Sequence, residues 1–150
     1  DGRSIQESKT FTAGDSPTVV KWRGWVFGLT ICYDLRFPEL YRYYMDHDVD
    51  VILVPSSFTL NTGQRHWHTL CKARAIENTV YILAPNQTGT GASGVQCYGH
   101  SMVVDYNGEV LAEASQESCE IINAKLSWDG LNEYRESMPV LKHRHPYLAR

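Results

Sequence analysis

The sequence predicts a single α/β domain, in which helices and strands alternate around one core. Of its 150 residues, 43% are hydrophobic and 21% are charged, a balance typical of globular chains and not of disordered ones. Apolar runs at residues 26–33 and 49–55 are typical of buried strands, and they enclose an amphipathic helix predicted at residues 39–46. This order is that of a β-α-β unit. No linker-like composition follows Thr18, so we expect residues 1–150 to form one domain or a large part of one.

A hairpin is expected before this unit. Residues 18–22 favour a strand, and Arg23-Gly24 separates them from the run 26–33 with a turn signal. The second run is apolar on both faces, as expected of a strand that lies between two layers. Pro38 suits the first turn of the helix that follows.

The second half of the chain predicts one long helix and further strands. Residues 64–78 place apolar side chains at helical spacing after a loop at residues 56–63. Asn107-Gly108 is the strongest hairpin signal in the chain. Residues 86–94 are rich in glycine, but no helix follows them, so they predict a loop and not a dinucleotide site. Strands are expected at residues 80–85, 101–105, 109–114 and 121–126, and a third helix, capped by Ser127, at residues 128–137.

Composition and charge exclude several classes of function. The net charge is −3, and without a basic excess we expect neither nucleic acid nor a membrane as a partner. The sequence contains no run of 18 apolar residues and no signal-peptide pattern, so we expect a soluble, cytoplasmic protein. The cysteines form no C-x-x-C pair, as expected of reduced thiols: Cys32, Cys71, Cys97 and Cys119. His66, His68 and His100 lack the spacing of an H-E-x-x-H motif, so we expect no metal and no cofactor.

Cys32 is the first candidate for chemistry. It ends the run 26–33 just before the predicted helix, at the carboxyl end of a strand, where ligand sites of α/β sheets gather. The backbone N–H of Tyr33 would point to the same place and could stabilise an oxyanion. From its position alone, however, a lone cysteine is more often a small buried hydrophobic residue.

The residues around Cys32 resemble a known family. Residues 28–40 read GLTICYDLRFPEL and are similar to the nucleophile segment of the nitrilase, or carbon–nitrogen hydrolase, superfamily. The similarity continues through His66-Trp67, ARAIEN at residues 73–78 and YGHSMVVD at residues 98–105, and it covers nearly the whole chain. Within the superfamily, the chain most resembles Nit-type amidases, which include omega-amidases and deaminated-glutathione amidases. The resemblance implies a nitrilase-like four-layer αββα sandwich, of which this chain would lack the N-terminal part.

The resemblance also implies a reaction and its residues. Cys32 would attack the carbonyl of a small linear amide, ammonia would leave, and water would release a carboxylic acid from the thioester. Glu7, 25 positions before Cys32, matches an additional active-site Glu of the family, although a solvated loop carboxylate is the competing interpretation. The Glu that carries protons and the Lys that stabilises intermediates lie upstream of the matched part, so the 150 residues alone are expected to be inactive.

The substrate pocket is assigned less directly. Phe58, Asn61 and Thr62 follow a strand end in the predicted loop and could line the pocket; an exposed loop is the alternative. Asp34, Arg36 and Glu77 are interpreted as mainly architectural. His68 stands where many Nit-type relatives have Glu.

Two alternative functions and a homo-oligomeric state are also expected from the sequence. A catalytically silent nitrilase-like assembly or interaction subunit is the main alternative to an amidase, and a papain-like protease is a weaker one. Relatives pair through helices near the nucleophile and through the C-terminal segment, which implies a homodimer or a higher homo-oligomer. Aromatic and apolar residues of both segments favour such an interface: Tyr41, Tyr43, Tyr44, Trp128, Tyr134, Tyr147 and Leu148.

Overall fold

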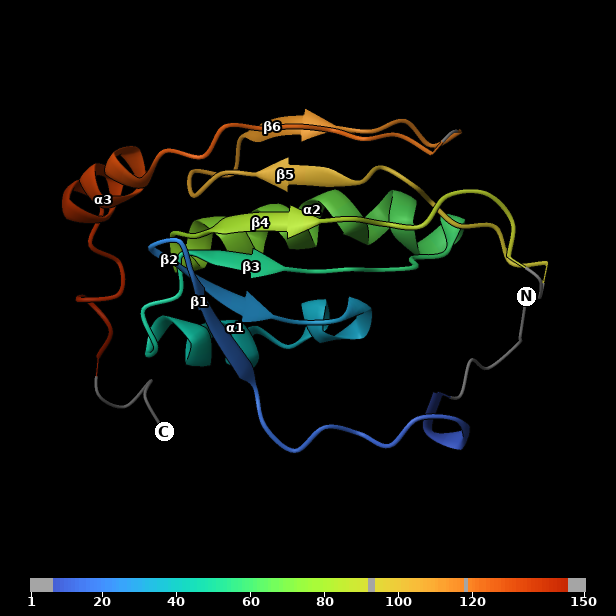
Figure 1. The fold of residues 1–150 in the computed structure, drawn as a ribbon, viewed down its shortest axis with the longest axis horizontal. Coiled ribbons are helices and arrows are strands. Elements are labelled where there is room, and N and C mark those ends of the chain that lie inside the picture. Colours follow the sequence, from blue (N-terminus) through green and yellow to red (C-terminus); the bar gives the residue numbers. More distant parts are fainter. Residues whose placement is uncertain (1–6, 92–93, 118, 146–150) are drawn as a thin grey trace.

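The computed structural model describes residues 7–91, 94–117 and 119–145, which form a mixed sheet with helices on one face and a further helix at one end (Figure 1). The sheet has six strands in chain order: β1 (Thr18–Trp22), β2 (Trp25–Leu29), β3 (Val51–Leu53), β4 (Tyr81–Ala84), β5 (Met102–Val104) and β6 (Val110–Glu113). The helices are α1 (Pro38–Met45), α2 (Leu60–Asn78) and α3 (Trp128–Ser137), with short 3₁₀ turns η1 (Glu7–Lys9) and η2 (Cys32–Arg36). No helix among these residues is long and apolar enough to cross a membrane.

The centre of the sheet is the predicted β-α-β arrangement. Strands β2, β3 and β4 are parallel, with α1 and α2 as the crossovers between them. Both predicted hairpins are confirmed, because β1 pairs antiparallel with β2 and β5 pairs antiparallel with β6. Gly24 and Gly108 have φ values of 84°, the left-handed conformation that these turns require. The α/β fold class is therefore confirmed.

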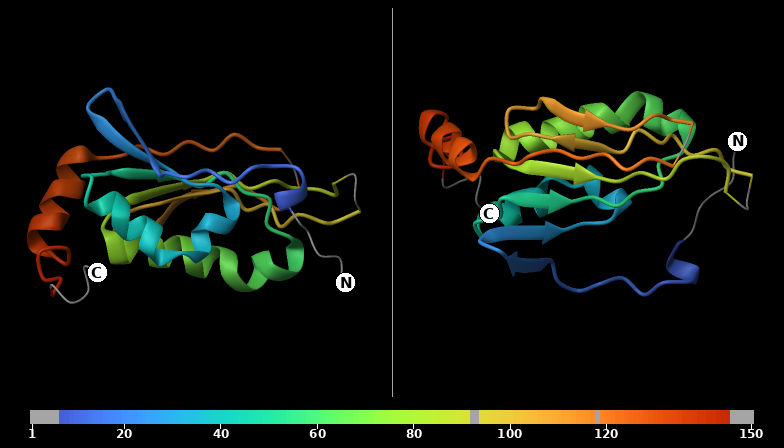
Figure 2. Two further views of the ribbon diagram at one scale, coloured as in Figure 1. Left: turned by 90° about the horizontal axis from the view of Figure 1, so that it is seen from below. Right: turned by 45° about the horizontal axis from the view of Figure 1, so that its top comes forward.

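The main core lies between the sheet and the helices α1 and α2, which cover the same face (Figure 2). Tyr41 and Tyr44 of α1 and Trp67 of α2 are fully buried in it. Gly28 of β2 allows α1 to approach the sheet, because a Cβ there would lie 2.9 Å from Cγ of Tyr44. The expectation that α1 displays Tyr41 and Tyr44 is therefore wrong, and only Tyr43 of the three is exposed.

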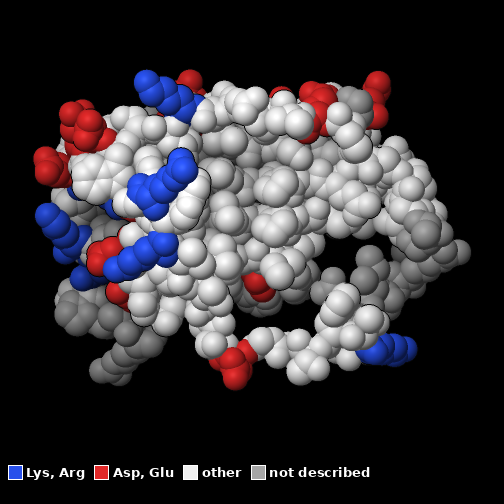
Figure 3. All heavy atoms as spheres, in the orientation of Figure 1, with Lys and Arg blue, Asp and Glu red and all other residues white. Residues whose placement is uncertain are grey.

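The other face of the sheet has a smaller apolar cluster. Val51, Tyr81 and Leu131 are its buried members, and Leu131 comes from α3. The segment 119–127 runs along this face (Figure 2), and the Tyr81 hydroxyl bonds to the backbone of Ser127. Charged side chains lie mostly around the margin of the face, which is largely uncharged at its centre (Figure 3).

Two expected boundaries and one expected strand differ in the structure. The strand expected at residues 26–33 ends at Leu29, because the chain turns into η2. The helix expected from residue 64 begins at Leu60. Residues 121–126 form no strand, because no described strand lies beside them to pair with, and Ile121 is 91% exposed.

Candidate active site

The turn η2 holds Cys32 at the carboxyl edge of the parallel strands. The residue begins η2, three positions after β2 ends, and its N–H donates to the Pro55 carbonyl at 2.9 Å. Its φ of 45° is uncommon for a residue other than glycine, and such conformations concentrate at functional sites. The side chain is half-buried and contacts the main core. The thiol therefore lies at a fixed place beside the ends of β2 and β3.

Asp34 closes the turn. Its Oδ2 accepts the N–H of Ile31 at 2.8 Å, and its own N–H donates to the Ile31 carbonyl at 3.0 Å. The N–H groups of Cys32 and Asp34 are thus paired. The Tyr33 N–H between them has no acceptor among the described residues. First-turn N–H groups are the natural donors for a negatively charged oxygen.

Arg36 connects Tyr33 with Phe58. The guanidinium lies 5.6 Å from the centre of the Tyr33 ring and 5.4 Å from that of Phe58. Phe58 is buried, and its ring packs against Trp67 with the centroids 4.9 Å apart. Tyr33 is 62% exposed. The structure thus brings two of the predicted site residues together around a single cation.

The other predicted site residues are placed differently. Asn61 and Thr62 lie in the first turn of α2 and not in a loop, because the helix begins at Leu60. The Thr62 hydroxyl is 3.0 Å from the hydroxyl of Thr59, whereas Asn61 is exposed. Glu7 lies in η1, and its side chain is outside what the structure describes.

Asn86 organises the site, and sequence reasoning missed it. Its Oδ1 accepts the N–H of Phe58 at 2.9 Å, and its Nδ2 donates to the Gly99 carbonyl at 2.6 Å. The signal available in the sequence was its position directly after the predicted strand 80–85, at the same sheet edge as Cys32. Without this amide, the Phe58 N–H would be buried and unpaired.

Arg74 and Glu77 of α2 stabilise the turn η2. The Arg74 Nε donates to the Leu35 carbonyl at 3.0 Å, and its Nη1 lies 2.9 Å from Glu77 Oε1. Arg74 is buried, and its guanidinium lies 5.3 Å from the centre of the Tyr41 ring. A buried cation of this kind needs its partner, so Glu77 positions Arg74 against η2.

The other cysteines have different surroundings. Cys71 is fully buried in α2, and burial raises the pKa of its thiol far above the ordinary value. Cys97 is also buried, with its Sγ 3.4 Å from the Ser57 hydroxyl. Cys119 is exposed in the segment that follows β6. Of the four, Cys32 is the half-buried thiol at the carboxyl edge of the sheet.

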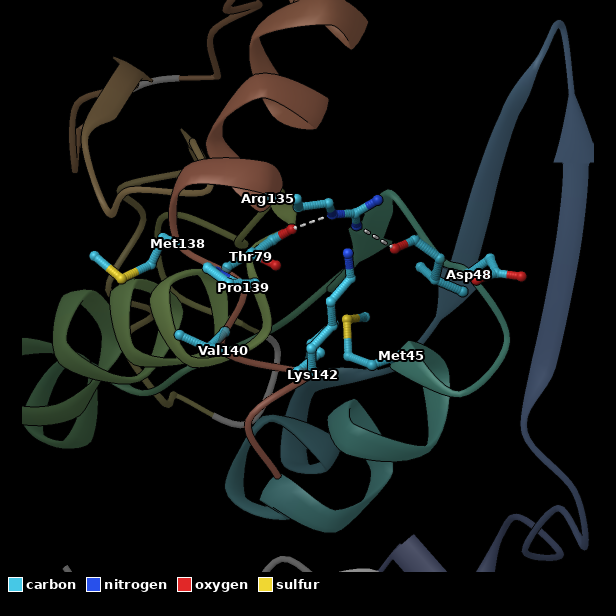
Figure 4. A pocket seen from close by; sticks show the side chains of 10 residues that line it. Met45, Asp48, Thr79, Arg135, Met138, Pro139, Val140 and Lys142 are labelled. Atoms are coloured by element: carbon cyan, nitrogen blue, oxygen red, sulfur yellow. Dashed lines mark hydrogen bonds between the residues drawn. The ribbon is translucent and has the colours of Figure 1, made fainter. Parts of the chain in front are cut away.

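A pocket of about 170 Å³ lies at the opposite end of the sheet (Figure 4). Its lining includes Val49 and Thr79, which precede β3 and β4, whereas Cys32 follows β2. The Arg135 side chain in this pocket donates to the carbonyls of Thr79 and Val49 and to Asp50. These bonds anchor α3 to the sheet. The pocket is separate from the cysteine site.

One cluster of metal-ligating side chains forms in the described residues. His68, His100 and Glu113 come from α2, the segment before β5 and the end of β6. His66, by contrast, points its Nδ1 toward the Arg36 guanidinium at 3.4 Å. The expectation of no metal rested on the spacing of histidines within one segment. Such spacing cannot reveal ligands that come from three separate elements.

Comparison with known proteins identifies the family. The sequence profile described as carbon–nitrogen hydrolase matches residues 1–136. The chain belongs to the carbon–nitrogen hydrolase family. It is 44% identical over 146 residues to a deaminated glutathione amidase of Synechocystis, a match that covers 96% of this chain and 53% of the relative. It is 43% identical over 147 residues to a 2-oxoglutaramate amidase of Paenarthrobacter nicotinovorans, covering 95% of this chain and 49% of the relative.

Solved structures of carbon–nitrogen hydrolases have the same fold. Saccharomyces cerevisiae Nit3 superposes with a TM-score of 0.85 at 37% identity, over 93% of this chain and 51% of Nit3. The Caenorhabditis elegans NitFhit protein gives a TM-score of 0.88 at 40% identity, over 98% of this chain and 36% of NitFhit. The chain thus spans about half the length of the curated relatives it matches, or less. Its relatives are Nit-type amidases of the nitrilase superfamily.

Proposed function

We propose that the protein carrying this chain is a thiol amidase, which hydrolyses a small linear amide to a carboxylic acid and ammonia. The observation that supports this most is the Cys32 turn, where a half-buried thiol at the sheet edge lies next to the Tyr33 N–H, which has no acceptor in the described part of the chain. The relatives named as amidases of deaminated glutathione and of 2-oxoglutaramate favour a substrate that bears a carboxylate. No cofactor takes part in the proposed reaction.

The proposed reaction has two stages. A general base takes the Cys32 thiol proton, Sγ bonds to the amide carbon, the carbonyl π electrons move to oxygen, and the Tyr33 N–H stabilises that oxyanion. The carbon–nitrogen bond then breaks, and the nitrogen leaves as ammonia after it receives a proton. In the second stage water adds to the thioester carbon, the carboxylic acid is released, and the thiol regains its proton.

A base and a cation are needed beside the thiol. An unassisted cysteine thiol is mostly protonated at neutral pH and reacts slowly. We propose that both come from a segment upstream of this chain, as in the family scheme of one Glu and one Lys, and that Glu7 orients the Lys. Residues 1–150 would then be part of one longer domain.

The substrate would lie between the thiol and the aromatic groups beside it. Phe58 is held rigidly by Asn86 and Trp67, so its ring is suited to form a wall of the pocket. Asn61 and Thr62 would reach the substrate from the first turn of α2. Arg36 lies beside the same ring, where a cation favours a substrate carboxylate.

A second sheet is proposed to cover the face of the sheet opposite α1 and α2. Trp22 and Leu29 leave apolar surface exposed there, and the centre of the face is largely uncharged (Figure 3). Burying such a face against another sheet would give the four-layer αββα sandwich. We further propose a cytoplasmic location, which is supported by four free cysteines.

Replacement of Cys32 tests the proposed function. The Cys32→Ala variant should lose turnover of short linear amides such as 2-oxoglutaramate, while circular dichroism remains that of the wild type. Cys119→Ala removes an exposed thiol and should leave the rate unchanged. Near-normal turnover by Cys32→Ala would exclude this nucleophile. A wild-type protein without activity on any short amide would indicate a silent assembly subunit instead.

A further inference from the structure

Three side chains with metal-binding groups meet at the outer edge of the sheet. His68 Nε2 donates to Glu113 Oε1 at 2.9 Å, and His100 Nδ1 donates to the same oxygen at 2.6 Å. Their ligand atoms all lie within 4.8 Å of one another. The three residues are separated by at least 13 positions along the chain, so the tertiary structure brings them together.

The packing around the cluster fixes the orientation of the rings. The His100 carbonyl accepts the Trp67 indole N–H at 2.7 Å, one residue before His68 on α2. The Tyr98 ring lies 4.4 Å from the His100 ring and 6.0 Å from the His68 ring, measured between centroids. Glu113 is paired with Met102 in the β5–β6 ladder, and Met102 is buried beneath the helices. Each ligand is therefore held by its own element.

We propose that His68, His100 and Glu113 form a binding site for one divalent transition-metal ion, for which Zn²⁺ is the probe. Two imidazole nitrogens and one carboxylate oxygen are a donor set that zinc accepts, with water in a fourth position. Calcium and magnesium prefer sites made of oxygen alone, and this set does not suit them. The inference does not depend on the proposed amidase activity.

Binding requires the three side chains to adjust, and the two nitrogens, now within 4.8 Å of each other, must come to the same spacing as the other ligand pairs. Ligand atoms at about 2.1 Å from a tetrahedral ion are roughly 3.4 Å apart. The present separations of 2.6 and 2.9 Å from Glu113 Oε1 must therefore widen by less than about 1 Å. The side chains of His68, His100 and Glu113 are 34%, 25% and 33% exposed, so they can separate toward solvent and admit a bound water. Each ring then carries its proton on the nitrogen that faces away from the ion.

Metal binding by the purified protein tests this site. The protein is freed of metal with a chelator, dialysed, and titrated with Zn²⁺ in competition with a chromophoric chelator. We expect one ion per chain, a thermal midpoint that rises with Zn²⁺, and visible d–d bands when Co²⁺ replaces it. Because Cys32 is also a potential zinc ligand, the titration is repeated with Cys32→Ala, which should still bind one ion.

Substitutions in the cluster locate the ion. His68→Gln and Glu113→Gln should weaken Zn²⁺ binding at least ~10-fold and abolish its effect on the thermal midpoint. His66→Gln, two residues away on the same helix, is the matched control and should bind as the wild type does. If Glu113→Gln does not fold, the Co²⁺ spectra of the wild type and His68→Gln decide the question. Absence of stoichiometric binding by the wild type, or equal losses in His66→Gln and His68→Gln, would overturn the site and leave a hydrogen-bonded cluster.

Discussion

At the scale of single residues, the surroundings of each thiol decide its chemistry. Cys32 and Cys71 both follow an apolar residue, but the sequence predicts Cys32 at a strand end and Cys71 within a helix. The structure gives Cys32 a half-buried position on a turn with positive φ, whereas Cys71 is enclosed by the main core. Burial disfavours a thiolate, so Cys71 is unsuited to be a nucleophile.

The buried thiol of Cys71 makes stability depend on alkaline pH. Burial raises its pKa in the folded state, and the nearby Arg74 guanidinium offsets this only in part. Below the unfolded pKa of ~8.5 both states keep the proton and the stabilisation is fully present. Above it only the unfolded chain loses the proton, so the free energy of unfolding falls by about 1.4 kcal/mol per pH unit.

Urea unfolding between about pH 8.5 and 10 measures this effect. The wild type should lose stability with rising pH more steeply than Cys71→Ala, which lacks the buried thiol. Cys119→Ala keeps the buried thiol and should follow the slope of the wild type. Parallel curves for the wild type and Cys71→Ala would contradict the prediction.

Glu7 is predicted to act on turnover and not on stability. If it orients an upstream Lys, Glu7→Gln should lower the rate on the order of 10²-fold, as loss of one stabilising group typically does. Its thermal midpoint should change little. Glu109→Gln, at an exposed position in the β5–β6 hairpin, is the control for the loss of one carboxylate. Steady-state rates and melting curves on the same samples check both, and an unchanged Glu7→Gln rate would make Glu7 a solvated loop residue.

At the scale of elements, close approach of α2 to the rest of the fold depends on a glycine. Gly63 lies in the first two turns of α2, against the Tyr98 side chain. A Cβ at this position would lie 2.3 Å from Cβ of Tyr98, and that atom cannot move without its backbone. The same contact aligns α2 with the Tyr98 to His100 segment. Helix propensity and packing therefore favour opposite residues here.

Gly63→Ala separates these two effects. Alanine inside a helix is favourable by about 1 kcal/mol relative to glycine. Overpacking typically costs about 1–3 kcal/mol, and with so short a contact we expect it to exceed the gain, which makes the variant less stable. Gly14→Ala, in open space, should change stability by less than about 0.5 kcal/mol. Chemical denaturation of both variants measures whether stability rises or falls. A more stable Gly63→Ala would show that Tyr98 moves away to make room for the methyl group.

At the scale of the whole molecule, the two sheet faces differ in how they are buried. Helices α1 and α2 cover the centre of one face, whereas the other has α3 and the segment 119–127 over part of its area (Figure 2). Exposed aromatic rings are found outside this face too, at Tyr43 on α1 and Trp128 at the start of α3. Tyr134 is half-buried, and Tyr147 and Leu148 lie outside the described residues.

We predict that the protein is at least a homodimer at micromolar concentration. The exposed Tyr43 ring lies on the helix that the family resemblance places at the interface, and exposed aromatics are enriched in such contacts. Light scattering on the purified protein measures the mass, and a monomer would refute the prediction. Tyr43→Ser should shift the equilibrium toward monomer, whereas Ile121→Ser removes an exposed side chain elsewhere and should leave it unchanged.

The sequence by itself determined much of the local structure and indicated the family. The hairpin at Arg23-Gly24, the Pro38 start of α1 and the Ser127 cap of α3 depend on neighbouring residues, so short-range chemistry predicts them. The segment GLTICYDLRFPEL is equally local, and it indicated the family that the profile match then showed.

Only the tertiary structure decided which distant side chains meet. Asn86 bonds to Phe58 across 28 positions, and Glu113 bonds to His68 across 45, so no spacing rule could predict either contact. The failed strand at residues 121–126 has the same cause, because a strand needs a neighbour whose position the segment itself does not specify. Hydrogen bonds along a helix or around a turn are determined by local sequence, whereas contacts between elements depend on how the whole sheet is assembled.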